Sequence, residues 1–206
     1  MKSTLLVGIV VSSFLFLNGC SNEGSSSSLD GYNGRFIDSP VDGVDFECGS
    51  VTGKTKDGGI FGTCPYGSSV TFKLGNLVLA TASQEQVERR NYNIFIKDIV
   101  TNEDDAVKSA LLLLSLDTDP NDDIITIPDE ATISEVLKEL DLDSASNLSS
   151  VDIQILEQDI AKLASEKPEI VQDVAIDVAK SHLDITEESI PELPPVPQPG
   201  EQTGGE

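Results

Sequence analysis

The chain has 206 residues and a formal net charge of −23, with 13 Lys and Arg against 36 Asp and Glu. So acidic a chain repels phosphate backbones, which argues against a nucleic-acid partner. Its hydrophobic content of 38% is too high for a wholly disordered protein, and its length allows one or two small domains. One His and three Cys leave few groups for metal or acid–base chemistry.

The first predicted element is a secretory signal peptide over residues 1–19. Lys2 precedes an apolar stretch, Leu5–Leu17, that rises only about 20 Å as a helix. This is short of the ~30 Å hydrocarbon core of a membrane, so we do not expect a transmembrane span. A basic start followed by a short apolar run is typical of an exported protein.

Leu17-Asn18-Gly19-Cys20 resembles the bacterial lipobox, in which Leu stands three residues before an invariant Cys and a small residue directly before it. The resemblance implies cleavage after Gly19, a diacylglycerol on the Cys20 thiol and a further acyl chain on its amine. Two or three acyl chains anchor a protein stably, whereas one binds only marginally. The alternative is a signal peptide with an incidental Cys.

Residues 20–30 are then the lipidated Cys and a flexible, Ser-rich tether. Ser21, in place of an Asp after the Cys, resembles a sorting signal for the outer membrane. Cleavage would remove Lys2 and no acidic residue, so the mature chain would have a formal net charge of −24 (12 basic against 36 acidic residues). It has no basic patch. We therefore expect lipid, and not charge, to hold the protein at the membrane.

Residues 31–97 are predicted to form a small β-sandwich or barrel. Short alternating segments are separated there by turn signals such as Asp42-Gly43 and Asp57-Gly58-Gly59. The candidate strands are Arg35–Ile37, Val44–Cys48, Gly59–Gly62, Val70–Leu74 and Leu77–Ala80. A module of this size without Trp has a poor core, which calls for a covalent staple.

Cys48 and Cys64 are the candidates for that staple. Export places them in an oxidising compartment, and a disulfide closing a loop of about sixteen residues is worth roughly 3 kcal/mol. The alternatives are two free buried thiols or, with no further soft ligand nearby, a metal site.

Residues 98–189 are predicted to form about four helices in a small bundle-like domain. Ala106–Leu116 is apolar nearly all round and follows an Asn102 cap, which indicates a helix buried on most sides. A second helix follows Asp129, and a third is expected after Ser149 or Ser150. The fourth is expected to begin at Pro168. The predicted fold class is therefore α+β.

Residues 190–206 are rich in Pro and Glu and are predicted to be a disordered, semi-extended acidic tail. A ligand for a reader of proline motifs is conceivable, but a solubilising tail is the simpler interpretation.

Asp117-Thr118-Asp119-Pro120-Asn121-Asp122-Asp123 is the best candidate site. Oxygens at alternate positions of a loop, here Asp117, Asp119, Asn121 and Asp123, can encircle a calcium ion. The sixth position is Asp122 where an EF-hand has Gly, and the twelfth is Pro128 where it has Glu. The alternative is an ordinary acidic turn, and no other cofactor is indicated.

Gly49–Thr55 superficially resembles a phosphate-binding loop, but its glycines are separated by three residues and not four, and a turn follows where a helix is needed. We therefore expect no nucleotide. Catalytic constellations are also missing from the sequence. The only histidine, His182, is interpreted as a solvated residue late in a helix, and no G-x-S-x-G motif occurs.

Gly34–Gly49, together with Gly53–Thr55, Asp57–Phe61 and Val70–Gly75, resembles a module at the start of many Gram-negative surface lipoproteins. Several of these proteins are long and adhesin-like. The resemblance implies a prealbumin- or immunoglobulin-type sandwich for the β module. Leu112–Ile127 also resembles their downstream segment, in which a leucine-rich helix precedes an Asp-rich loop.

These observations predict a lipoprotein anchored to the outer membrane through Cys20, on its periplasmic or its surface face. Its expected role is non-catalytic, as an envelope or surface module that binds a protein or a polysaccharide. A calcium-stabilised structural or adhesion accessory is the second hypothesis. An envelope enzyme with an unrecognised site is the third.

Overall fold

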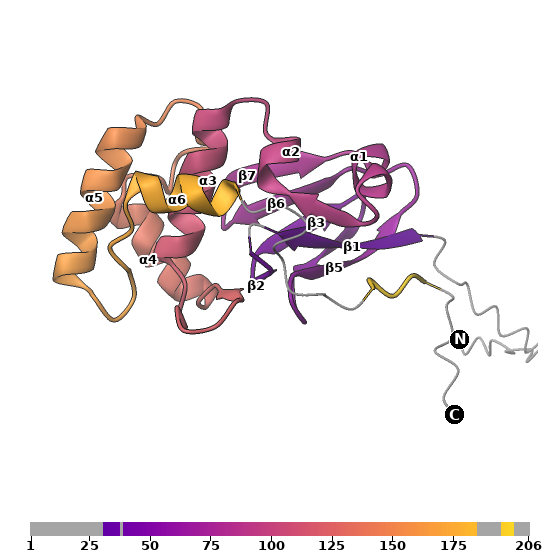
Figure 1. The fold of residues 1–206 in the computed structure, drawn as a ribbon, viewed down its shortest axis with the longest axis horizontal. Coiled ribbons are helices and arrows are strands. Elements are labelled where there is room, and N and C mark those ends of the chain that lie inside the picture. The colour runs from indigo at the N-terminus through magenta and orange to yellow at the C-terminus, as the bar shows by residue number, and fades with distance from the viewer. Residues whose placement is uncertain (1–30, 38, 185–194, 200–206) are drawn as a thin grey trace, which may run out of the picture.

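The computed structural model describes residues 31–37, 39–184 and 195–199 (Figure 1). The predicted signal peptide, Cys20 and the tether lie outside the described residues. The strands are β1 (Gly31–Ile37), β2 (Val41–Asp42), β3 (Asp45–Cys48), β4 (Val51–Lys54), β5 (Ile60–Pro65), β6 (Val70–Leu74), β7 (Leu77–Ala82), β8 (Asn93–Phe95) and β9 (Ile125–Thr126). The helices are α1 (Gln84–Arg89), α2 (Ile96–Ile99), α3 (Glu103–Ser115), α4 (Glu130–Glu139), α5 (Ile153–Glu166) and α6 (Ile176–Leu183).

The predicted α+β class is confirmed, with two main sheets in the β module. One sheet has the order β5-β1-β8 and the other the order β4-β3-β6-β7. Aromatic rings pack between them: Phe36 of the first sheet stacks on Phe72 of the second with ring centroids 4.1 Å apart. Phe61 meets Phe72 edge-on at 5.2 Å. This ring cluster is the centre of the β module, because β-sandwiches bury the inward side chains of both sheets.

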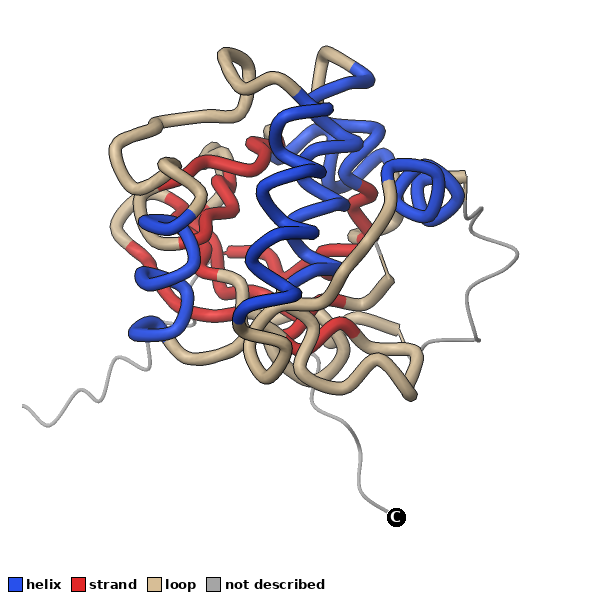
Figure 2. The backbone as a smooth tube through the Cα atoms, turned by 90° about the vertical axis from the view of Figure 1, so that its left-hand side faces the viewer, coloured by secondary structure: helices blue, strands red, loops and turns tan. Residues whose placement is uncertain are grey.

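Helix α3 is the central helix, and it packs against α2, α5 and α6. Nine of its residues are buried, which confirms the prediction of a helix buried on most sides. Its first turn is capped as expected, since the Asn102 side chain accepts a hydrogen bond from the backbone N–H of Asp104 at 3.1 Å. Figure 2, viewed from the helical side, shows most of the helices in front of the strands.

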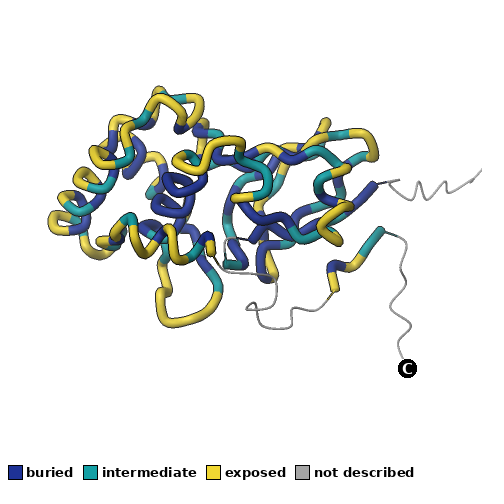
Figure 3. Tube along the Cα trace, turned by 45° about the horizontal axis from the view of Figure 1, so that its top comes forward, coloured by how far each residue is buried: buried dark blue, intermediate teal, exposed yellow. Residues whose placement is uncertain are grey.

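The core is continuous across the predicted boundary between residues 97 and 98. A single cluster of buried apolar residues runs from Tyr32 to Leu183 and includes both sheets and the inner faces of the helices (Figure 3). Strand β2 pairs in parallel with β9, which lies between α3 and α4. Val78 of β7 forms a further bridge with Asn147. The β module and the helices therefore share one core.

Two helix starts differ from the sequence prediction. Asp152, and not Ser149 or Ser150, caps α5, because its carboxylate accepts from the backbone N–H groups of Gln154 and Ile155. Ser149 donates instead to Asp105. The fourth helix begins at Ile176 and not at Pro168.

The residues between Pro168 and the start of α6 are not helical because their backbone is hydrogen-bonded to the end of α3. The N–H of Gln172 donates to the carbonyl of Ser115 at the end of α3, at 2.8 Å. Val171 is buried against the core. The first turn of α6 is then capped from a neighbouring helix, since Glu157 of α5 accepts from the N–H of Ile176 at 2.8 Å.

None of the helices in the described ranges combines the length and the apolar character that crossing a membrane requires.

Candidate functional site

The predicted disulfide is confirmed: Cys48 and Cys64 are bonded, with their Cα atoms 5.4 Å apart. Cys48 ends β3 and Cys64 lies in β5, so the bond joins the two main sheets. Both sulfurs lie in the core, where each residue is at most 1% exposed. The bond is therefore a structural staple and not an exposed redox site. Cys20, the predicted lipidation site, lies outside the described residues.

The predicted calcium loop lines an acidic cleft of about 290 Å³ between α3 and α6. The structure brings to this loop residues that are distant in the sequence, which we call the cleft partners. They are Ser39, Gln172, Asp173 and His182. Gln172 holds the loop directly, since its side-chain amide donates to the backbone carbonyl of Asp117.

Carboxylates of the loop accept hydrogen bonds from N–H groups of the same loop. The Asp117 carboxylate accepts from the N–H groups of Asp119 and Thr126, at 3.1 and 3.0 Å. Asp119 accepts from both the backbone and the side chain of Asn121. Asp122 accepts from the N–H of Ile124 at 2.9 Å. The three bonds to the N–H two residues further on form Asx turns, which Asp and Asn commonly make in loops.

The structure does not assemble the predicted ligands Asp117, Asp119, Asn121 and Asp123 into a metal centre. Among the described residues, no three Asp, Glu, His or Cys side chains gather so that they could hold a metal ion. Carboxylate oxygens of Asp117, Asp119 and Asp122 accept from backbone N–H groups of the loop, so the loop uses them for its own hydrogen bonds. The geometry favours the ordinary acidic turn.

His182 is half-buried in this cleft, where it was expected to be solvated. Its Nδ1 lies 3.5 Å from the Ser39 hydroxyl, at the limit of a hydrogen bond. A nucleophile–base pair also needs a third group that orients the base. Within the described residues, His182 has no hydrogen bond to a carboxylate that would orient it as a base.

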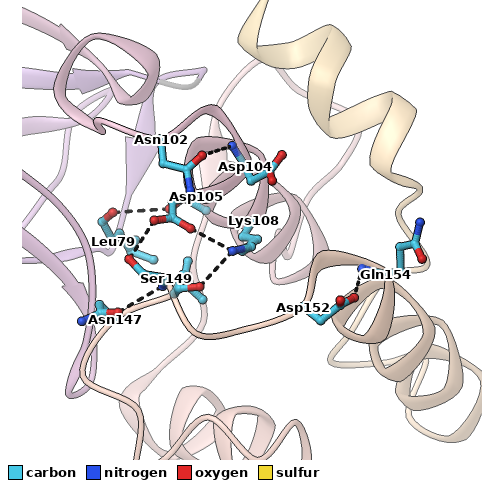
Figure 4. A network of polar contacts seen from close by, with 11 residues as sticks. Leu79, Asn102, Asp104, Asp105, Lys108, Asn147, Ser149, Asp152 and Gln154 are labelled. Carbon is cyan, nitrogen blue, oxygen red and sulfur yellow. Dashed lines mark hydrogen bonds and ion pairs between the residues drawn. The ribbon is translucent and has the colours of Figure 1, made fainter.

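A polar network on α3 is centred on the buried ion pair of Lys108 with Asp105 (Figure 4). Lys108 donates to Asp105 at 2.8 Å and to the carbonyl of Leu148 at 3.0 Å. Ser149 donates to the other oxygen of the Asp105 carboxylate at 2.8 Å. Ser109, one residue on, donates to the carbonyl of Leu79 in β7. The network fastens α3 to the α4–α5 connection and to the sheet.

The environment of Asp105 favours its charged form. Burial by itself would raise the pKa of this carboxyl, but the hydrogen bonds from Lys108 and Ser149 and the charge of Lys108 outweigh it. The pKa is therefore held below its usual value. A signal for this pair was present in the sequence, because Lys108 interrupts an otherwise apolar helix face and Asp105 stands three residues before it.

Replacing Lys108 with Met is expected to lower the free energy of unfolding by about 2 kcal/mol at pH 7. The Asp105 carboxylate, 14% exposed, then lacks its counter-charge. The loss is below the ~3–5 kcal/mol of fully buried pairs because Ser149 still donates to Asp105. Urea unfolding measures it. The exposed pair of Lys167 with Glu135 supplies the control, Lys167→Met, which should change stability little.

The loss of stability in Lys108→Met is also expected to depend on pH. The folded-state pKa of Asp105 is below the unfolded value, so the pair stabilises the protein above about pH 4 and loses this contribution as the pH falls through the folded-state pKa. In Lys108→Met, burial favours the protonated carboxyl. The stability difference from wild type should therefore narrow toward about pH 3. A difference that stays constant with pH would contradict this role for the ion pair.

Five residues of the predicted disordered tail, Pro195–Pro199, are placed by the structure against β1. The side-chain amide of Gln198 bonds to both backbone groups of Asn33, and Val196 is buried. For these five residues the structure differs from the prediction. The rest of the tail lies outside the described residues.

The comparisons with known proteins give no relative for this chain. No protein-family model, no characterised protein and no solved structure matches it.

Proposed function

We propose that this protein is a lipoprotein of the outer membrane that serves as a non-catalytic binding or accessory module of the cell envelope. The observation that carries the proposal is the Cys48–Cys64 disulfide, which joins the two sheets in the core. Structural disulfides persist in exported proteins and are rare in the cytosol. The bond thus agrees with the signal peptide and the lipobox-like sequence before Cys20.

The arrangement of the fold supports presentation of a binding surface away from the membrane. β1 begins at Gly31, eleven residues after Cys20, and an extended tether of that length reaches at most about 40 Å. The start of β1 and helix α5 lie at opposite ends of the molecule (Figure 1). An anchor at Cys20 would keep the β module near the lipid and turn α5 outward.

Two exposed apolar side chains lie on the helices of that outward part. Ile155 of α5 is 58% exposed and Val178 of α6 is 50% exposed. We infer that a protein or polysaccharide partner is met there, and that the β module is the anchor-proximal module of the surface lipoproteins it resembles.

Replacing Cys20 with Ala is expected to move the protein from the membrane fraction to the soluble fraction. The reason is that this thiol would carry the acyl chains, and no basic patch replaces them. Fractionation with immunoblotting measures the shift, and incorporation of a labelled fatty acid into wild type alone measures the modification. Asn22→Ala serves as the matched control and should stay with the membrane. Unchanged fractionation of Cys20→Ala would refute the anchor.

A further inference from the structure

The C-terminal segment Pro195–Pro199 is hydrogen-bonded to Asn33 of β1. The backbone N–H of Asn33 donates to Oε1 of Gln198 at 3.3 Å, and Nε2 of Gln198 donates back to the Asn33 carbonyl at 3.3 Å. The Asn33 side chain donates to the carbonyl of Pro197 at 2.5 Å. Asn33 thus contacts a segment more than 160 residues away through both its backbone and its side chain.

Among the described residues, no strand pairs with β1 at Asn33 on the edge that β8 occupies further along. The N–H of Arg35 donates to the carbonyl of Tyr92 on the β8 side, and β8 pairs with β1 only from Arg35 onward. Backbone groups of residues two apart in a strand point to the same edge. The N–H and carbonyl of Asn33 therefore face this edge ahead of β8.

The side-chain amide of Gln198 bonds to this edge of β1 as a backbone peptide group would. Its primary amide offers one acceptor and a donor, which is what a pairing strand would offer. Extended peptides are recognised in this way when they add to an open sheet edge. Pro197 and Pro199 lack N–H groups and cannot add to the ladder themselves, so the Gln side chain makes both contacts to the strand.

The segment has the pattern of a ligand in other respects. Val196 is 8% exposed, whereas Pro195 and Pro197 on either side of it are exposed. Prolines restrict a chain to extended conformations before binding, so little entropy is lost when it docks. Between the described residues the contact with Asn33 is nevertheless small: it consists of three hydrogen bonds, and Val196 is the buried apolar side chain of the segment. Docking is therefore reversible.

We propose that the edge of β1 at Asn33 is a binding site for extended proline-rich segments with a central Gln, and that the chain's own Pro195–Pro199 occupies it in cis. Eleven residues, 184–194, lie between the end of α6 and the segment. A tether of that length gives an effective concentration on the order of millimolar, so the cis segment masks the site from a dilute competitor. The site goes beyond the proposed function and does not depend on the anchor.

The test uses the full mature chain with Cys20→Ser and a labelled peptide spanning residues 193–201. Gln198→Glu removes the donor to the Asn33 carbonyl and frees the site, so this variant should bind the peptide at least 10-fold more tightly than the chain with the natural tail. Gln202→Glu makes the same charge change outside Pro195–Pro199 and should bind like the natural tail. Fluorescence anisotropy measures the affinities.

Two further arms assign the site. Adding Asn33→Ala to Gln198→Glu should weaken peptide binding at least fivefold, because the bond to the Pro197 carbonyl is lost. Hydrogen exchange should show the Asn33 amide protected with the natural tail and with Gln202→Glu, but not with Gln198→Glu. Equal peptide affinity in all variants, no binding at millimolar peptide, or unchanged exchange at Asn33 would overturn the proposal. A dimer that Gln198→Glu abolishes would overturn the cis assignment.

Discussion

Replacing Phe72 with Ala is expected to lower the free energy of unfolding by about 3–5 kcal/mol. Phe72 is fully buried in β6 and contacts the rings of Phe36 and Phe61, which both belong to the other main sheet. Its removal leaves a cavity between the two sheets and breaks both ring contacts. The side chains around the cavity are held by strands and cannot collapse fully into it.

The same variant tests whether the protein has one core. The buried cluster includes Phe72 of the sheet and Leu112 of α3. Phe72→Ala and Leu112→Ala should therefore each lower the denaturant midpoint of one and the same unfolding transition. Denaturant titrations followed by far-UV circular dichroism, which reports the helices, and by Tyr fluorescence, which reports the β module, should coincide. Val178→Ala on the exposed face of α6 is the control, with an expected change within about 0.5 kcal/mol.

Two separate transitions, of which Phe72→Ala moves only one, would contradict a shared core. That outcome would support two separately folding domains that meet between residues 97 and 98.

Replacing both Cys48 and Cys64 with Ala is expected to lower the free energy of unfolding by about 3 kcal/mol. The two cysteines are 16 residues apart in the sequence, and the bond between them restricts the unfolded chain by that loop. For a chain of this size the loss corresponds to a Tm lower by about 6–12 °C. Both positions are buried, so Ala preserves much of the apolar packing.

Thermal unfolding with and without reductant measures the disulfide. The comparison uses chains with Cys20→Ser, so that the pair alone responds to reductant. Reduction should lower the Tm of the chain with the wild-type cysteine pair and should leave the Tm of the double Ala variant unchanged. If reduction leaves the Tm of the wild-type pair unchanged, the bond is not the staple that the sheet arrangement requires.

The features that sequence reasoning predicted correctly have local causes. Asn102 caps α3 through a hydrogen bond from the N–H of Asp104, as predicted. The helix predicted after Asp129 begins there because Asp129 accepts from the N–H of Thr132. The apolar run after Asn102 predicted the central helix because the pattern of its own residues required burial on nearly all sides. The cysteine pair could be predicted because the predicted export to an oxidising compartment and the shortage of core residues both favoured a bond.

The features that it missed depend on partners far along the chain. β8 is three residues long and pairs with β1, so its existence depends on a strand some sixty residues away. The start of α6 was wrong because Ser115 and Glu157 hold the residues around it. In the acidic loop the residue types were compatible with calcium, but the hydrogen bonds of Asp117, Asp119 and Asp122 could not be seen in the pattern.

The amino-acid sequence by itself determined the class of the fold, the disulfide and the Asn102 cap of α3, because these depend on nearby residues and on composition. Only the tertiary structure decided that the sheets and helices share one core, that the acidic loop closes on itself, and that Gln198 meets Asn33. The physical reason is the same in each case. A hydrogen bond or packing contact between distant residues stabilises a conformation for which no local pattern encodes a preference.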